Sequence, residues 1–255
     1  MSKPAQPASS IPSLHQAGRP HPFSSYRPPV AAVPEQLAWM CQNYQALEIA
    51  PIVRIPAPDP YQASIALDGG AAGVVAPYVE TVEEVHKLVG AVKFFPLKGK
   101  KLNDMLTKTS PPEKKLERYL QKHNEEKSLI VNIESLPAIE ALEDILAVEG
   151  LDAILVGPHD LSCSLGIPEE YTNPIFLDAI EQIIHKACEQ NISVGIHVFF
   201  PDLDQEIRWI QAGANFVLHS GDILLFKNAL QREIASLRTS VGDVKGAEGE
   251  GQIIV

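Results

Sequence analysis

Polar and charged side chains interrupt this sequence at the carboxyl ends of short apolar runs. Arg54 lies in IVRIP, Glu134 follows VNI, and His159 and Asp160 follow AILVGP. Each run precedes a helix-forming stretch, so the runs are predicted to be parallel strands. The carboxyl ends of parallel strands meet on one face of the sheet. We therefore expect these residues, although distant in sequence, to be neighbours.

Glu134 and Asp160 have the clearest chemical implication. Two carboxylates at buried strand ends repel each other unless a cation lies between them. Carboxylate oxygens, waters and substrate oxygens form a hard octahedral ligand set, which suits Mg²⁺ or Mn²⁺ better than a closed zinc site does. Such a cation can bind a chelating 2-oxo acid. Arg54 would then stabilise the negative charge on the keto oxygen when an enolate forms.

Other interpretations of these residues stay open. Either carboxylate could cap the following helix or pair with Arg54. The strand-end histidines His159, His197 and His219 could be three zinc ligands, or they could line a pocket. Cys163 could be a nucleophile, but no paired base is evident, so a small buried filler is the expected role.

Composition narrows the class of protein. The 255 residues carry a formal net charge of −11, which argues against nucleic acid as a partner because phosphate binding needs a basic face. No apolar run is long enough to span a membrane, and no signal peptide is evident. The three cysteines are scattered without metal or redox spacing, which predicts a reduced, cytoplasmic chain.

The sequence divides into three parts. Residues 1–34 contain eight of the 21 prolines and are predicted to form a disordered arm. Residues 35–240 alternate between apolar runs and helical patterns, which predicts one barrel domain. Residues 241–255 are loop-like and are predicted to be a flexible tail.

Six strand-plus-helix units are visible in the central part. Their strands are expected in APIVRIP, GVVAPYV, SLIVNIE, DAILVGPHD, SVGIHVF and NFVLHSG. Helix starts follow them, for example Asp59-Pro60 and the capping box Thr81–Glu84. The pattern predicts an α/β protein with buried parallel strands, and an eight-stranded βα barrel fits best. A doubly wound open sheet would produce the same alternation, so both topologies stay open.

The motifs together resemble the HpcH/HpaI aldolases, the class II pyruvate-dependent aldolases, from about Glu35 to about Leu230. The resemblance rests on APIVRIP, ALDGGAAGVVAPYVETVEEV, VNIES, GLDAILVGPHDLSCSLG and GANFVLHSGD. It implies a (β/α)8 TIM-barrel fold of the phosphoenolpyruvate/pyruvate superfamily. It also implies a lyase that cleaves 4-hydroxy-2-oxo acids to pyruvate and an aldehyde through a metal-bound enolate.

The resemblance also assigns roles to residues. Glu134 and Asp160 match the ligands of a divalent cation, Mg²⁺ or Mn²⁺ with Co²⁺ as a further candidate. Arg54 matches the residue that contacts the pyruvyl oxygen, and Asn132 matches a polar residue of the same pocket. The backbone at His159-Asp160 matches the site of the substrate carboxylate. The partners implied are a 2-oxo acid, an aldehyde and further copies of the chain, which exchange their C-terminal helices in a homo-oligomer.

Two departures accompany the resemblance. The first two βα units of the barrel are not visible, because residues 1–34 are proline-rich where those units belong. His21 is the candidate to replace the family's proton-transferring histidine, which would lie in that region. Phe95 stands where the family has Arg or Tyr, which implies the loss of a contact near the site.

Two alternatives to an active aldolase follow. A catalytically degenerate relative would bind metal and 2-oxo acid, or associate with intact subunits, without turnover. A lyase acting on phosphoenolpyruvate or CoA esters is a further alternative, although no phosphate cradle or basic patch for CoA is evident.

Overall fold

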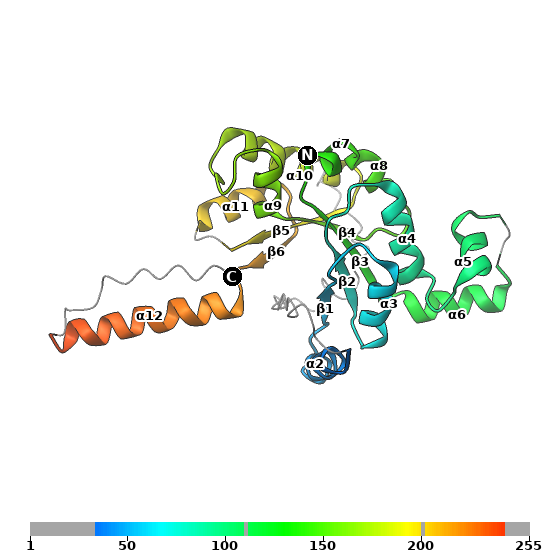
Figure 1. Cartoon of the computed structure of the whole chain (residues 1–255), viewed down its shortest axis with the longest axis horizontal. Helices are drawn as coiled ribbons and strands as arrows, with labels where there is room; N and C mark the ends of the chain where they lie inside the picture. The colour runs from blue at the N-terminus through cyan, green and yellow to red at the C-terminus, as the bar shows by residue number, and fades with distance from the viewer. Residues whose placement is uncertain (1–33, 110–111, 200–201, 243–255) are drawn as a thin grey trace, which may run out of the picture. The chain divides into compact units, whose positions relative to one another are not determined.

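The computed structural model describes residues 34–109, 112–199 and 202–242 (Figure 1). The chain forms two compact units, Met1–His219 and Ser220–Val255. His21 and nearly all of the predicted arm and tail lie outside the described residues. Their predicted roles, and the absence of two βα units, therefore stay predictions.

The first unit contains six parallel strands, whose order in the sheet is their order in the sequence (Figure 1). They are β1 Ile52–Arg54, β2 Gly73–Ala76, β3 Ser128–Ile133, β4 Ala153–Val156, β5 Ser193–Val198 and β6 Phe216–His219. A doubly wound sheet reverses its strand order at a switch point. These strands show no reversal, and the sheet curls as a half-barrel. The predicted α/β fold with parallel strands is confirmed, and the curled sheet is consistent with the predicted barrel.

Helices alternate with the strands. They are α2 Pro34–Ala46, α3 Pro60–Asp68, α4 Val82–Lys93, α5 Gly99–Leu106, α6 Lys114–Asn124, α7 Leu136–Glu140, α8 Leu142–Leu146, α9 Pro158–Ser164, α10 Pro174–Glu189, α11 Leu203–Ala212 and α12 Asp222–Ser240. The predicted starts are confirmed: Asp59 accepts the Tyr61 N–H, and Thr81 and Glu84 form a capping box. Helices α5 and α6 were not predicted.

Each strand has two faces with different contents. Val74, Val131 and Ile154 belong to the large core, which is shared with the helices. Val75, Ile130 and Leu155 form part of a small second cluster on the other face. Successive side chains of a strand point to opposite faces of the sheet, so residues two positions apart share a face. A polar residue that lies two positions after a member of the second cluster therefore points to the same face as that cluster.

This alternation positions two of the predicted site residues. Arg54 comes two residues after Ile52, and Asn132 comes two residues after Ile130. Both therefore belong to the face of the curled sheet opposite the large helix-covered core, which forms its interior. A close approach fills part of this interior, since a Cβ on Gly195 would lie 2.1 Å from the ring of Phe216.

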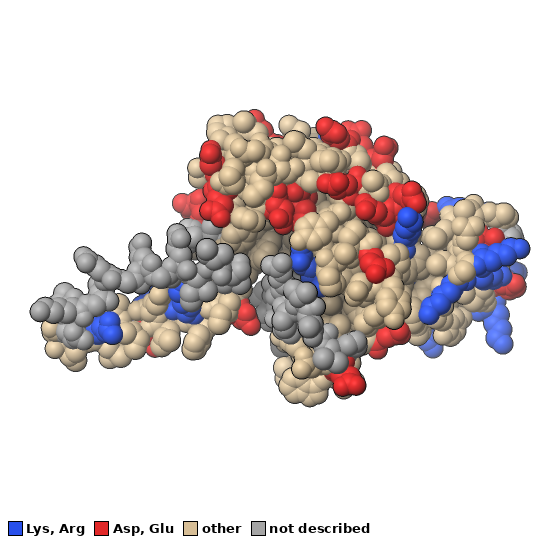
Figure 2. Space-filling view, viewed as in Figure 1, with Lys and Arg blue, Asp and Glu red and all other residues tan. Residues whose placement is uncertain are grey.

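Charge is spread unevenly over the first unit. Figure 2 shows basic side chains gathered over α5 and α6, whereas acidic side chains dominate the surface near α7 and α8. Among the described helices, none has the length and apolar character needed to cross a bilayer.

The second unit is described by itself. Helix α12 has no buried residue. Its exposed large apolar side chains are Ile223, Leu225, Phe226, Leu230, Ile234 and Leu237.

A buried ion pair joins α4 to the amino ends of β3 and β4. The Asp152 carboxylate lies 2.6 Å from the Lys93 ammonium and accepts the Leu129 N–H at 2.7 Å. Burial raises the pKa of Asp152, and Lys93 and the Leu129 N–H oppose this shift. The pair is therefore strongly desolvated, and removal of either residue leaves the other charge without its ion-pair partner.

We expect Asp152→Ala to lower the free energy of unfolding by about 3 kcal/mol, because it leaves the Lys93 ammonium and the Leu129 N–H without their partner. Urea unfolding followed by circular dichroism measures this. Glu149→Ala is the matched control: its pair with Lys108 is exposed, so the loss should stay below about 1 kcal/mol. Equal losses in the two variants would contradict the assignment.

Candidate active site

The predicted site residues lie at the carboxyl ends of the strands. Arg54 is the last residue of β1, Asn132 lies near the end of β3, and Glu134 follows that strand. His159 and Asp160 lie in the first turn of α9, which follows β4. Because neighbouring strands pair in parallel, all five residues lie at the same end of the sheet.

Glu134 is the buried centre of this group, with 4% of its surface exposed. Its Oε1 accepts the Tyr78 N–H at 2.7 Å, and its Oε2 accepts Asn132 Nδ2 at 2.9 Å. Burial raises the pKa of Glu134, and the two hydrogen bonds oppose the shift. The negative charge of Asp160 raises the pKa further, whereas the positive charge of Arg54 lowers it. The three charged groups therefore act on one another across the site.

Asp160 and His159 differ from Glu134 in being exposed. His159 Nδ1 lies 3.9 Å from a Glu169 carboxylate oxygen. Burial raises the pKa of Tyr171 to about 12, and the charges of Glu169, Cys163 and Asp160 add to the shift. The site therefore contains one buried carboxylate, that of Glu134, and one exposed carboxylate, that of Asp160.

Tyr78 is a site residue that the sequence patterns did not reveal. It has a φ of 57°, which is uncommon for a residue other than glycine. This backbone conformation accompanies an N–H directed at Glu134. The Arg54 guanidinium lies 5.6 Å from the centre of the Tyr78 ring, within cation–π distance. The only sequence signal was its place in the turn after β2.

Gly157 allows Glu134 to occupy its position. A Cβ on Gly157 would lie 2.5 Å from Oε2 and 3.0 Å from Cβ of Glu134. Any larger side chain would force the Glu134 side chain to shift from this position. The GPHD motif therefore needs glycine for a close approach.

The donor set fits a hard divalent cation. Glu134 is a buried carboxylate with a raised pKa, and Asp160 is a second carboxylate within its electrostatic range. Asn132 Oδ1 is buried and has no hydrogen-bond partner within the described ranges. Oxygen ligands of this kind suit Mg²⁺ or Mn²⁺. The part of the chain that the structure describes holds no group of three or more His, Cys, Asp or Glu suited to a metal.

The zinc alternative is not supported. His219 Nδ1 lies 2.9 Å from Glu206, while His159 and His197 each contact the ring of Phe199. No three-ligand group joins these histidines among the described residues. The expectation that Cys163 is buried was wrong, because the thiol lies on the exposed side of α9. Helix α9 buries Leu161 and Ser162 but exposes Cys163 to solvent.

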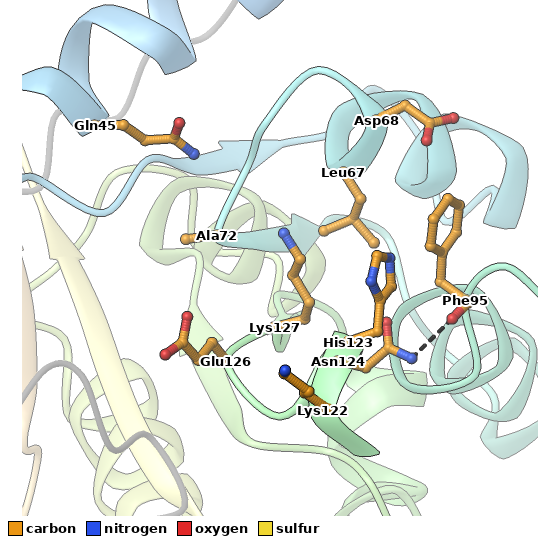
Figure 3. Close-up of a pocket in the computed structure, with 10 residues that line it drawn as sticks. All are labelled: Gln45, Leu67, Asp68, Ala72, Phe95, Lys122, His123, Asn124, Glu126 and Lys127. Atoms are coloured by element: carbon orange, nitrogen blue, oxygen red, sulfur yellow. Dashed lines mark hydrogen bonds between the residues drawn. The ribbon is translucent and has the colours of Figure 1, made fainter. Parts of the chain in front are cut away.

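Phe95 also lies elsewhere than expected. Phe95, Ala72 and Lys127 line the same cavity (Figure 3). Ala72 directly precedes β2, and Lys127 directly precedes β3. This is the amino end of the sheet, whereas Glu134 lies at the carboxyl end of β3. Phe95 therefore replaces no contact beside Glu134.

A comparison with protein-family models identifies the family of this chain. The model of the HpcH/HpaI aldolase/citrate lyase family matches residues 31–229, most of the chain. The chain belongs to this family. The resemblance inferred from the motifs is thereby confirmed, and the family supports a lyase with a small-molecule substrate.

Curated relatives and solved structures agree with the assignment. The chain is 30% identical over 202 residues to 2-keto-3-deoxy-L-rhamnonate aldolases of Klebsiella pneumoniae and Escherichia coli, which covers 77% of this chain and 74% of each relative. An HpcH/HpaI aldolase of Desulfitobacterium hafniense superposes with a TM-score of 0.69 at 25% identity, covering 82% and 80% of the two chains. The citrate synthase SbnG superposes with a TM-score of 0.71 at 26% identity, covering 87% and 85%.

The raised pKa of Glu134 predicts a pH dependence of stability in protein freed of metal by a chelator. The folded state holds this proton more tightly than the unfolded state, whose carboxyl titrates near 4.5. Stability should therefore fall as pH rises above about 4.5 and level off once the raised pKa is passed.

Glu134→Gln removes this dependence, because the amide does not ionise. Asn132 can rotate its amide so that its unpartnered Oδ1 accepts the new N–H. We expect the variant to gain stability relative to the natural chain as the pH rises above about 4.5, measured as unfolding free energies in urea. Glu117→Gln on exposed α6 is the control. A pH-independent difference for Glu134→Gln would contradict the account.

Proposed function

We propose that the chain is a divalent-metal-dependent aldolase that cleaves 4-hydroxy-2-oxo acids to pyruvate and an aldehyde. The observation that carries the proposal is the buried Glu134 carboxylate within the electrostatic range of both Asp160 and Arg54. Family membership and the relatives that act on 2-keto-3-deoxy-L-rhamnonate, a 4-hydroxy-2-oxo acid, support it.

Glu134 and Asp160 would hold the cation, Mg²⁺ or Mn²⁺ with Co²⁺ as a further candidate. When bound, this cation supplies a Lewis acid for the substrate's 2-oxo acid group. The Tyr78 N–H and the Asn132 amide orient Glu134 for this role. Asn132 Oδ1 remains free to accept a hydrogen from a substrate hydroxyl or a water.

The remaining residues bind and polarise the substrate. Cleavage breaks the C3–C4 bond: the 4-hydroxyl loses its proton, the aldehyde leaves, and the electron pair moves to C3 and the keto oxygen. Arg54 stabilises the negative charge on that oxygen, and the Tyr78 ring positions its guanidinium. The first-turn amides of α9 at His159 and Asp160, which have no intrahelical partner, receive the substrate carboxylate. His21, which lies outside the described residues, stays a candidate for proton transfer, and the general base is not assigned.

We also propose that the protein is a homo-oligomer. The exposed apolar residues of α12, including Phe226 and Leu230, support the helix exchange that the sequence resemblance implies. Burial of such side chains is favourable by about 1.5–3 kcal/mol for each one.

Activity tests the proposal directly. The purified chain with Mn²⁺, Mg²⁺ or Co²⁺ should release pyruvate from 2-keto-3-deoxy-L-rhamnonate or another 4-hydroxy-2-oxo acid, measured with lactate dehydrogenase. Arg54→Ala should lower kcat by about 10²–10³, the loss typical of a group that stabilises developing negative charge. Arg118→Ala, which removes an exposed guanidinium on α6, should leave the rate unchanged.

Glu134→Gln and Asp160→Asn separate the proposal from its alternatives. Both should abolish turnover and the rise in melting temperature that the cation gives the natural chain. That rise corresponds to about 2.7 kcal/mol at a cation concentration 100 times Kd. If the natural chain binds cation and pyruvate without any turnover, the degenerate-relative alternative replaces the proposal.

Gly157→Ala tests the close approach at Glu134. The new Cβ would force the Glu134 side chain to shift, so the variant should fold and yet lose most activity and cation binding. Circular dichroism checks the fold and the pyruvate assay checks the site. Gly221→Ala is the control, because no atom lies within 4 Å of its Cβ position. Full activity in Gly157→Ala would show that Glu134 can work from another position.

A further inference from the structure

One row of residues crosses the carboxyl ends of three neighbouring strands, β3, β4 and β5 (Figure 1). The last pairs in the β3–β4 and β4–β5 registers both contain Val156. The Gly157 N–H continues the ladder by donating to the Ile133 carbonyl at 3.3 Å. One position beyond those pairs, Glu134, Gly157 and His197 therefore lie side by side. Two strand spacings separate the outer two residues, which places their Cα atoms about 10 Å apart.

The side chain of His197 points to the interior of the curled sheet. Its register partner in β6 is Leu218, which packs against the second hydrophobic cluster. Partners in a parallel pair of strands share a face of the sheet. The residues on either side, Ile196 and Val198, belong to the large core on the opposite face. His197 therefore faces the same interior as Asn132.

The two other histidines considered as zinc ligands are placed differently. His219 follows Leu218, so it points to the helix layer, where its Nδ1 lies 2.9 Å from Glu206 of α11. His159 lies in the first turn of α9 and is exposed. Of these three histidines, only His197 lies on the interior face at a strand end.

Ring contacts place His197 near the second carboxylate as well. The Phe199 ring lies 5.7 Å from the His197 ring and 6.5 Å from the His159 ring, edge-on in both cases. His159 directly precedes Asp160 in α9. The strand register and the aromatic contacts are independent observations, and both bring His197 to the group of residues around Glu134.

Gly157 leaves space between Glu134 and His197. The Glu134 carboxylate leans over this glycine, since its Oε2 would lie 2.5 Å from a Cβ there. No side chain of β4 therefore separates the carboxylate from the imidazole. In the proposed function, the 2-oxo end of the substrate lies at Glu134 and Arg54. The 4-hydroxyl is two carbon atoms farther along the substrate, and His197 is the interior side chain next to Glu134 on the β5 side.

We propose that His197 is the catalytic base that takes the proton of the substrate's 4-hydroxyl. This inference rests on the proposed aldolase function. In cleavage, the imidazole accepts the hydroxyl proton, the C3–C4 bond breaks, the aldehyde carbonyl forms, and the electron pair passes to the enolate. The imidazolium then releases its proton to solvent while C3 takes up a proton from solvent, so the protons balance. Imidazole is the side chain most often used for such transfers.

The experiment compares two reactions of the full-length chain with Mn²⁺. The first is release of pyruvate from a 4-hydroxy-2-oxo acid that the natural chain cleaves. The second is exchange of the methyl hydrogens of pyruvate in heavy water, followed by ¹H NMR. Exchange passes through the same enolate but involves no 4-hydroxyl. We expect His197→Gln to lower kcat for cleavage by about 10²–10⁴ with little change in KM, and to leave the exchange rate unchanged.

His185→Gln, at an exposed position of α10, is the matched control and should change neither rate. Unchanged cleavage in His197→Gln would overturn the proposal. An equal loss of both reactions would also overturn it, because the imidazole would then serve the enolate or the integrity of the site. His197→Asn repeats the comparison if circular dichroism shows that the glutamine variant does not fold. Absence of cleavage by the natural chain would instead contradict the proposed function, and that result is seen before any variant is made.

Discussion

The arrangement at the carboxyl ends of the strands depends on keeping the Glu134 carboxylate buried. A carboxylate with 4% exposure loses most of its hydration, and the pKa is raised as a result. The Tyr78 N–H and the Asn132 amide replace part of the lost hydration, one at each oxygen. The lack of a side chain at Gly157 leaves room for the group. What these contacts leave uncompensated is negative charge, which a cation or a neighbouring guanidinium offsets.

The two ends of the sheet are organised differently. At the carboxyl end, Arg54 and Asn132 lie beside a desolvated acid, and Asn132 Oδ1 has no hydrogen-bond partner among the described residues. At the amino end, the Lys93–Asp152 pair satisfies its members and joins a helix to two strands. This division matches the general pattern of βα barrels, in which catalytic residues lie at the carboxyl ends of the strands and residues at the amino ends contribute to stability.

Local patterns predicted the strands and most helices because their signals are local. The capping box at Thr81–Glu84 and the Asp59 cap depend on residues within one helical turn, and both formed as expected. Prediction was weaker where tertiary contacts decide. The helical stretch from Leu136 to Leu146 is broken at Ala141 into α7 and α8. The exposure of Cys163 depends on how α9 packs against the rest of the chain, which the local sequence does not indicate.

The βα alternation, the family and the polar residues at the strand ends could all be inferred from the order of residues. Periodicity and short motifs depend on neighbours along the chain, so they can be recognised without coordinates. The absence of a doubly wound strand order among the six described strands could be recognised only from the fold, since it lies in the order in which strands pair. The tertiary structure also placed the Tyr78 N–H on Glu134, a contact between residues 56 positions apart. Long-range contacts of this kind depend on how the whole sheet closes in space, and a backbone donor carries no residue-type signal.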